Sequence, residues 1–491
     1  MLGAAERRFN VLILYPSAGL FILVNAILLS RGNYYFLLFP LVPAILYSAL
    51  FSPGRLFMAV VFLAPLSVEL SRFAGELPFD ISLPTEPLIL VFLLVMLSGK
   101  LLNGSLNRKL LYHPLTLAVI FYLVWLVITT VTSTMPVVSL KFLLVRLGYV
   151  LMFYFLAVEI FRRRENIHGF LWCYIIGLSL VIIYTMYNHA GYGFLSQRAA
   201  HWVVRPFYND HTAYGAALAM FIPVLLFAPL KRKWHTAVLV LVFIVALVFS
   251  YSRAAWLSVG AAFLIWLVIT LRIRFATLVT FTIIAGGLVF MLRDDIVREM
   301  EKNRQDSSAN FREHIRSMTN ITSDASNLER INRWKAALAM YRERPVLGWG
   351  PGTYMFNYAP FQFSYDRTII STNFADGGDT HSEYLGPLSE TGLPGMLSFI
   401  LVAAIALYTG FRLLIRLERR KDRLLVKGIL LGLVTYLVHG TLNNFLHSDK
   451  AAIPFWGFLA VLAAMDLYGK KRAVSDKPAG ENAGLKNRSK K

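Results

Sequence analysis

The sequence is poor in cysteine, with only Cys173 among 491 residues. One thiol cannot close a disulfide within the chain, and a thiolate metal site needs several sulfur ligands, so both are excluded. The chain also lacks a recurring unit of about 20–50 residues. No small-residue cleavage site follows the first apolar block, so we expect this block to be retained rather than removed as a signal peptide.

Acidic residues are scarce beside basic ones: 28 Asp and Glu stand against 49 Lys and Arg, a formal net charge of +21. Such a charge suggests nucleic acid as a partner, but its distribution argues against one. The basic clusters fall at every second connection between apolar segments, as the positive-inside rule requires of cytoplasmic loops. These clusters are Arg7 with Arg8, Arg55, Lys100 with Arg108 and Lys109, Arg162–Arg164, Lys231–Lys233, Arg272 with Arg274, seven residues between Arg412 and Lys427, and eight from Lys470 onward.

Long apolar runs account for most of the remaining sequence, and 57% of the residues are hydrophobic. A run of about 20 apolar residues crosses roughly 30 Å of hydrocarbon as a helix. We predict an all-α, polytopic membrane bundle of about 14 spans with both termini in the cytoplasm. The third and fourth spans are short enough to be re-entrant. The predicted spans are 11–30, 33–51, 55–71, 86–102, 114–132, 140–161, 166–188, 211–230, 235–251, 254–271, 274–292, 393–415, 426–446 and 451–468.

The spans divide the chain into four parts. The first eleven spans form a membrane domain, 1–292, and the last three lie in 393–468. Between them, 293–392 is a long polar loop that the charge pattern places outside the cytoplasm. The segment 469–491 is a basic tail, which we expect to be disordered in the cytoplasm. Because so long a connection rarely lacks function, we predict that 293–392 is a partly helical, extracytoplasmic catalytic loop.

The loop contains one clear helical pattern. Asn327 can cap a helix over 328–344, and Pro345 would end it. Four apolar residues fall on one stripe of this helix, so we expect it to lie on the bilayer or to pack on the bundle. The stripe consists of Ile331, Trp334, Leu338 and Tyr341.

A second helix start is predicted around His381. Thr380 and Glu383 have the Thr-x-x-Glu spacing of a capping box, which predicts a helix from Thr380 to about Gly392. His381 would then be the first helical residue. The positive end of the helix would keep the imidazole neutral, as a general base requires, and free N–H groups there could receive an anion. The alternative is an ordinary polar histidine on the surface.

Several arginines fall on the extracytoplasmic side. Arg253 lies in a tight hairpin at the membrane surface, where it either snorkels to lipid phosphate or clamps an anion inside the protein. Arg198, Arg205 and His211 belong to a loop, 198–211, that is rich in aromatic and hydrogen-bonding residues. That composition suits contact with sugar or phosphate, and it suits an interfacial aromatic belt as well.

Three segments of this side form a specific combination. They are Arg253 to Leu257, with the pattern Arg-x-x-x-Leu; Arg330 through Trp334 into Pro-Val-Leu-Gly-Trp-Gly-Pro-Gly at 345–352; and His381-Ser382, followed after nine residues by Gly-Leu-Pro-Gly at 392–395. Together they resemble the O-antigen ligase and O-antigen polymerase family of bacterial membrane glycosyltransferases. The resemblance covers roughly 205–415, and the earlier spans match only as hydrophobic helices.

The resemblance implies an all-helical membrane fold whose long loop covers the active site. It implies an inverting glycosyltransferase that moves a glycan from undecaprenyl pyrophosphate to a sugar hydroxyl in surface polysaccharide or lipopolysaccharide assembly, without metal or cofactor. The acceptor is lipid A–core for a ligase or a second lipid-linked glycan for a polymerase, and the sequence does not separate the two. The implied location is the bacterial inner membrane, with the active site on the periplasmic face.

By the same resemblance, His381, Arg253 and Arg205 are the expected catalytic residues, with His381 as the base and the arginines as partners of the pyrophosphate. Arg198 competes with Arg205, because the family's Gly-Phe turn ending in Asn-Pro-Asn is absent here. The further substrate-binding residues, for pyrophosphate or glycan, are expected to be Arg198, His211, Arg330 and Glu383. No metal is expected; the carboxylates that could hold a cation instead are those of Asp376, Asp379 and Glu383.

Two other classes of function are considered. A polysaccharide flippase or another secondary transporter would have many spans too, but the sequence shows no paired broken helices and no row of carboxylates within the spans. A non-catalytic membrane scaffold that presents the loop to partners would leave the placement of Arg253 and His381 on one side of the membrane as coincidence.

Overall fold

The computed structural model describes residues 2–32, 35–38, 40–74, 81–103, 107–228, 233–271, 325–363, 371 and 378–469. The predicted eleventh span, the loop before residue 325 and the tail from residue 470 lie outside the described residues. The chain divides into two compact units, which are described separately. Unit 1 is Met1–Phe57 with Leu90–Gly104, and unit 2 is Met58–Ile89 with Ser105–Lys491.

Unit 1 contains the N-terminal helices. These are α1 (Leu2–Ser30), the 3-10 helix η1 (Tyr35–Leu38) and α2 (Leu41–Phe51). Where the chain turns after α1, the rings of Phe21 and Phe36 stack with their centroids 5.4 Å apart. The chain passes between the units within α3 (Pro53–Leu63) and α5 (Thr85–Asn103).

Unit 2 holds the other described elements. Its single described sheet is a two-stranded antiparallel ribbon. The elements are η2 (Ala64–Leu66), β1 (Val68–Glu69), α4 (Ser71–Ala74), β2 (Ser82–Leu83), α6 (Arg108–Leu111), α7 (Pro114–Val131), α8 (Pro136–Val150), a π-helical turn η3 (Leu151–Leu156), α9 (Ala157–Ile160), α10 (Arg164–Tyr192), α11 (Gln197–Ala200), α12 (His211–Phe227), α13 (Lys233–Phe249), α14 (Arg253–Leu271), α18 (Ala325–Glu343), α19 (Tyr354–Asn357), η4 (Ala359–Phe361), α20 (Leu385–Arg416), α21 (Arg420–His439) and α22 (Asp449–Tyr468).

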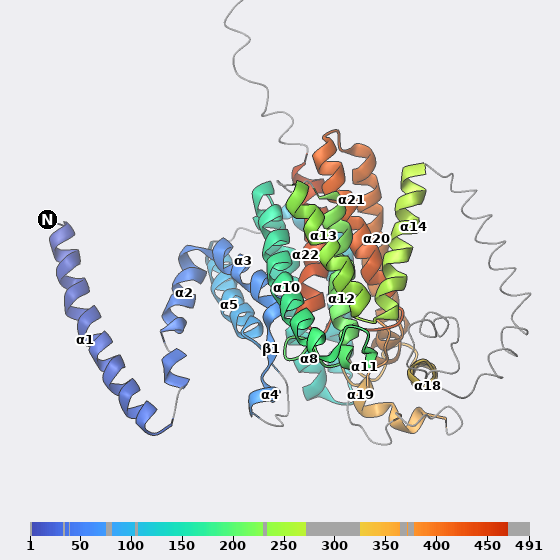
Figure 1. Cartoon of the computed structure of the whole chain (residues 1–491), viewed down its shortest axis with the longest axis horizontal. Helices are drawn as coiled ribbons and strands as arrows, with labels where there is room; N and C mark the ends of the chain where they lie inside the picture. Colours follow the sequence, from blue (N-terminus) through green and yellow to red (C-terminus); the bar gives the residue numbers. More distant parts are fainter. Residues whose placement is uncertain are drawn as a thin grey trace, which may run out of the picture. The chain divides into compact units, whose positions relative to one another are not determined.

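The long helices of unit 2 run side by side, and the loop elements α11, α18 and α19 gather at one end of them (Figure 1). The helix pair α12 and α21 packs most closely, because glycine on α21 leaves room for the neighbouring backbone. A Cβ at Gly432 would lie 2.5 Å from the carbonyl oxygen of Met220 on α12. Helix α22 is buried along nearly its whole length, so the core of the bundle lies around it.

The apolar composition of these helices fits a multi-pass membrane protein. Six described helical segments are long and apolar enough to cross a membrane. They are Pro114–Val131, Pro136–Ile160, Arg164–Tyr192, Arg253–Leu271, Leu385–Arg416 and Asp449–Tyr468. Shorter apolar helices occupy Tyr15–Ser30, Pro53–Leu66, Thr85–Val95, His211–Phe227 and Trp234–Phe249. The mainly helical fold class is thus confirmed, while the count of about 14 spans and the cytoplasmic termini stay predictions.

Two predicted element boundaries are wrong. The third span was expected over 55–71, but the α-helix ends at Leu63, and Val68 and Glu69 pair with β2 instead. The helix expected from Thr380 to about Gly392 begins later, at Leu385. Its predicted end is confirmed, because Gly392, with a φ of 71°, interrupts α20 and a second helical stretch continues to Arg416. By contrast, the helix predicted over 328–344 is confirmed as α18, to within three residues at its start and one at its end.

The glycine-rich turn after α18 is docked on the first part of α20. The N–H groups of Trp349 and Gly350 donate to the carbonyl oxygens of Ser389 and Glu390, at 3.1 and 2.8 Å. A Cβ at Gly392 would lie 2.0 Å from the carbonyl oxygen of Val346, so glycine is required at this contact. The turn therefore joins the polar loop firmly to the membrane helix that follows it.

Candidate functional site

His381 lies in a short turn, 378–384, that leads from the polar loop into α20. Its backbone is left-handed, with a φ of 52°, so it cannot be the first residue of a right-handed helix. The helix begins four residues later, at Leu385. Ser382 lies just before this start, and its Oγ accepts hydrogen bonds from the N–H groups of the second and third residues after it, each at 3.3 Å. The predicted capping box of Thr380 and Glu383 is therefore wrong.

Glu383 holds this turn against the segment that joins α21 to α22. Its Oε1 accepts hydrogen bonds from the Tyr436 hydroxyl at 2.6 Å and from the N–H groups of Phe445 and Leu446 at 2.7 and 2.8 Å. Its own N–H donates to the carbonyl oxygen of Gly440 at 2.7 Å. The residue is buried. Its carboxylate thus bridges two segments of the chain rather than closing a helix N-terminus.

Arg333 on α18 fixes the other side of the turn, and sequence reasoning missed it. Its Nε lies 2.8 Å from Oε1 of Glu329, and its Nη1 donates to the carbonyl oxygen of Asp379 at 2.9 Å. The side chain of Asp379 also accepts a hydrogen bond from Asn444. Both members of the Glu329–Arg333 pair are buried. The signal in the sequence was a glutamate four residues before an arginine on a predicted helix.

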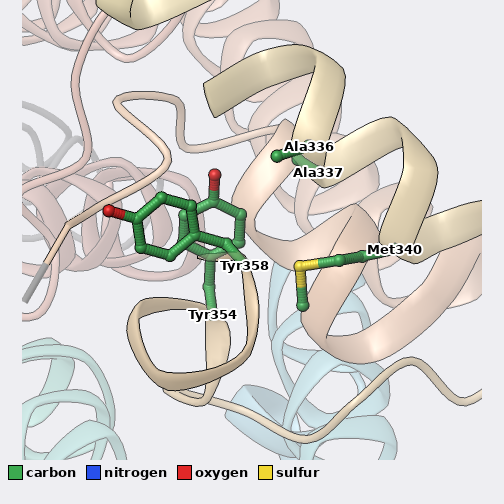
Figure 2. Packing of buried hydrophobic residues seen from close by; sticks show 5 residues of the cluster. All are labelled: Ala336, Ala337, Met340, Tyr354 and Tyr358. Atoms are coloured by element: carbon green, nitrogen blue, oxygen red, sulfur yellow. The ribbon is translucent and has the colours of Figure 1, made fainter. Parts of the chain in front are cut away.

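A small hydrophobic cluster holds α18 in this position (Figure 2). Ala336, Ala337 and Met340 of α18 pack against Tyr354 and Tyr358, which follow the glycine-rich turn. The two tyrosine rings stack with centroids 5.0 Å apart and an interplanar angle of 12°. One of these rings, that of Tyr358, also lies 5.7 Å from the guanidinium carbon of the buried arginine on α18. The cluster thus couples the helix to the turn.

The imidazole of His381 is held neutral by its surroundings. Burial, followed by the positive charge of Arg333, lowers its pKa to about 4. Arg330 acts in the same direction, while Asp379 and Asp210 oppose the shift. The sequence also predicted a neutral imidazole, but it attributed this to the positive end of a helix. In the structure, burial and two arginines of α18 lower the pKa of His381 instead. Charges from α18 and from Asp210 therefore both act on this histidine.

Asp210 and His211 stand at the start of α12. The Asp210 carboxylate accepts a hydrogen bond from the N–H of Thr212 at 3.1 Å and caps the helix. His211 Nδ1 lies 2.8 Å from Asp210 Oδ1, and its ring centroid is 4.1 Å from that of His201. Burial alone would raise the pKa of Asp210, but His211 and Thr212 outweigh it and hold the pKa below its usual value. This carboxyl is therefore ionised at neutral pH.

Arg253 is the first residue of α14 and is half-buried. The backbone of the next residue, Ala254, lies beside the imidazole of His439 at the end of α21, and Arg330 and Asp210 are among the charges that act on that imidazole. The same two charges act on His381. The start of α14, the start of α12 and the His381 turn therefore lie near the end of α21, and the charge of Arg330 on α18 acts there as well.

Arg205 and Arg198 are less closely associated with His381 than the arginines of α18. Arg198 lies on α11 and Arg205 in the turn after it, and both are exposed. Neither is among the charges that act on His381 within the described ranges. Their loop is tied to the β1–β2 ribbon region, because Asn209 accepts a hydrogen bond from Arg72 and donates one to Glu69. The loop is thus tied to α4 and β1, and its two arginines are exposed.

Arg146 is a second residue that sequence reasoning missed. It lies on α8 and is only 6% exposed, yet its Nη1 has no hydrogen-bond partner in the part of the chain that the structure describes. Its charge acts on Tyr122 and Tyr436, which also feel the charge of Glu383. Arg146 therefore lies within electrostatic range of Tyr436, whose hydroxyl bonds Glu383. The signal was an arginine inside an apolar span, where ionisable residues usually mark function.

No group of three or more His, Cys, Asp or Glu side chains that could hold a metal ion occurs among the described residues. Of the carboxylates considered for a cation, those of Asp379 and Glu383 accept hydrogen bonds from Asn444 and Tyr436. Asp376 lies outside the described residues.

Comparison with known proteins finds one family that matches part of the chain. Residues 237–400 match the family described as O-antigen ligase. The matched stretch includes Arg253, Arg330, Arg333 and His381, and it leaves out Arg146 and the 198–211 loop. No curated protein sequence matches the chain. This part of the chain is therefore similar to O-antigen ligases, and the match supports a glycan-transferring membrane enzyme.

Proposed function

We propose that this chain, through the part that is similar to O-antigen ligases, transfers a glycan from undecaprenyl pyrophosphate to an acceptor sugar hydroxyl on the periplasmic face of the bacterial inner membrane. The reaction inverts the anomeric carbon and uses no metal. The observation that carries the proposal is His381, a half-buried imidazole whose pKa is lowered, in a turn that Arg333 of the loop helix bonds inside the matched domain. A neutral imidazole beside fixed cations suits proton removal next to an anionic leaving group.

His381 acts as the general base. It accepts the proton of the acceptor hydroxyl as that oxygen attacks the anomeric carbon of the donor. The bond between this carbon and the phosphate oxygen breaks, and undecaprenyl pyrophosphate leaves with the electron pair. A base contributes about 10²–10⁴-fold to such a step. In the free protein its pKa of about 4 makes it a weak base. A bound pyrophosphate offsets the cations of Arg330 and Arg333 and so raises that pKa toward the useful range.

Arg253 and Arg330 bind the pyrophosphate. Arg253 lies near the end of α21, where the charge of Arg330 also acts, and a guanidinium matches phosphate oxygens with two parallel N–H donors. Arg146 is proposed as a third anion-binding arginine, set deeper in the bundle. A buried guanidinium with an unpaired nitrogen is unfavourable unless an anion reaches it, and the arriving pyrophosphate supplies one.

Arg333 and Glu383 are proposed as positioning residues. Neither needs to touch the substrate, because each already bonds the chain on one side of His381. Their joint effect is to hold the imidazole where the acceptor hydroxyl arrives. A displacement of about 1 Å of such a group costs roughly 10²-fold in rate.

Arg205 remains our candidate for the second essential arginine, with Arg198 as its competitor. Their loop is anchored beside the site, and His211 at its end pairs with Asp210, whose charge reaches His381. An exposed arginine on an anchored loop is suited to meet the donor as it enters. The acceptor is lipid A–core for a ligase or a second carrier-linked glycan for a polymerase.

The test uses purified protein in liposomes with synthetic undecaprenyl-pyrophosphate oligosaccharide, with and without lipid A–core. Transfer to lipid A–core identifies a ligase, and chain extension without it identifies a polymerase. His381→Ala is the inactive control, and Arg342→Ala, an exposed change on α18, is the matched active control. Movement of the oligosaccharide across the membrane without any new glycosidic bond would overturn the proposal and favour a transporter.

A further inference from the structure

A cavity of about 260 Å³ opens where α7 ends against the turn that follows α18. It is lined by Thr132, Arg344, Pro345, Val346, Leu347 and Gly348. Helix α7 is one of the apolar segments able to cross a membrane, and Thr132 comes directly after its last residue. The cavity is therefore at the level where a membrane helix gives way to the polar loop.

The lining combines one cation with apolar surface. Arg344 is exposed, and its guanidinium carbon lies 4.5 Å from the ring centroid of Trp349. Stacking on an indole fixes the plane of a guanidinium and leaves its in-plane N–H groups free to bind an anion. Beside it, Val346 is 57% exposed, and Val131 at the end of α7 is 79% exposed. Such a mixture fits a molecule that is charged at one point and apolar next to it.

The walls of the cavity are held in place before any ligand arrives. The carbonyl oxygen of Trp349 accepts hydrogen bonds from the N–H and Oγ1 of Thr134, at 3.0 and 2.8 Å. The Trp349 Nε1 donates to the carbonyl oxygen of Met340 at 3.0 Å. On the far side, the N–H of Leu393 donates to the carbonyl oxygen of Pro345 at 2.9 Å. A preformed site binds without a large cost of ordering.

Helix α18 connects this cavity directly to the His381 turn. Arg344 follows its last residue, and Arg333, which bonds the carbonyl oxygen of Asp379, lies eleven residues earlier. At 1.5 Å per residue this separation is about 16 Å along the helix. A molecule whose charged head occupies the cavity can therefore extend a sugar chain along the loop to His381.

We infer that the cavity binds the phosphate-bearing head of the acceptor lipid, so that the acceptor enters from the membrane with its lipid chain still in the bilayer. This rests on the proposed function, because it assigns a place to the acceptor of that reaction. Arg344 binds the head phosphate, the apolar lining meets the first part of the acyl or prenyl chain, and the glycan reaches the base. The lining includes none of the residues assigned to the chemistry.

The test compares two forms of one acceptor glycan: the lipid-anchored form with its head phosphate, and a water-soluble form without lipid and phosphate. Two variants perturb the cavity differently. Arg344→Ala removes the cation, and Thr132→Trp fills the space while Arg344 remains. The control is Arg342→Ala, an exposed arginine two residues away that does not line the cavity. Each variant is first checked by its thermal unfolding midpoint and its elution as a single species.

For both cavity variants we expect the KM of the lipid-anchored acceptor to rise at least tenfold with kcat unchanged, while the soluble acceptor and the Arg342→Ala control behave as the wild type. Running lipid A–core and undecaprenyl-pyrophosphate glycan as separate anchored acceptors shows which lipid head the cavity takes. An unchanged KM for every anchored acceptor, or an equal rise for the soluble one, overturns the inference. Neither result affects the proposed function, which fails instead if His381→Ala retains its rate.

Discussion

The bond from Arg333 to the carbonyl oxygen of Asp379 should be essential for activity without touching the substrate. In Arg333→Met that bond is lost, and Glu329, which is 3% exposed, loses its cationic partner. Removing one member of a buried pair costs about 3–5 kcal/mol. Ser371 and Asn332 also donate to Glu329, so we expect the lower end, about 3 kcal/mol. Without this bond the turn no longer holds His381 in a fixed position, so turnover should fall about 10²-fold.

A double variant separates stability from positioning. Arg333→Met combined with Glu329→Gln no longer leaves a buried charge, so most of the unfolding free energy should return. The bond to Asp379 stays absent, so turnover should not return. The assays are thermal unfolding in detergent and the rate of glycan transfer from undecaprenyl pyrophosphate. Arg342→Ala on the same helix should change neither quantity.

The pH dependence of kcat/KM distinguishes an effect of Arg333 on the His381 pKa from a purely structural role, which would leave that dependence unchanged. Arg333 is the largest charge that lowers the His381 pKa, so its removal should move that pKa from about 4 toward the ordinary 6.5. The base is active when neutral, so the acidic limb of kcat/KM should shift to higher pH in Arg333→Met. If the double variant recovers turnover together with stability, or if the acidic limb stays in place, Arg333 is a stabilising residue only and the argument fails.

Four further outcomes are expected. His381→Ala should lower turnover by about 10²-fold or more with donor KM nearly unchanged, and EDTA should not affect the wild type; restoration of a chelated enzyme by a divalent cation would replace the base by a metal mechanism. Wild-type kcat/KM should be level from neutral pH to about pH 5 and fall through about pH 4, and a limb near pH 6.5 would contradict the lowered pKa of His381. Arg253→Lys keeps a charge but loses the two-pronged geometry, so transfer should fall by most of its value while membrane insertion is unchanged; normal turnover would make Arg253 a lipid anchor. Arg146→Gln should raise the donor KM about 10–100-fold without loss of folding, whereas a more stable protein with an unchanged KM would remove Arg146 from the site.

Much of the fold could be predicted, because its signals are local. A helix inside a membrane is indicated by a continuous apolar run. A helix in the loop is indicated by an N-cap residue, an apolar stripe and a terminating proline, and these signals predicted the ends of α18 to within a few residues. The capping box at Thr380 failed although its spacing was correct. Glu383 has stronger donors elsewhere, in Tyr436 and in N–H groups 62 and 63 residues along the chain.

The sequence by itself determined that this is a helical membrane protein and which side chains carry the family motifs. Only the tertiary structure decided what surrounds His381. Arg333 and Asp379 are 46 residues apart in the chain, and the span that holds Arg146 comes long before the loop. Apolar runs and helix caps act within a few residues, so composition and spacing reveal them. The partner of a buried charge is chosen by where the packed helices meet, and no pattern along the chain records that meeting.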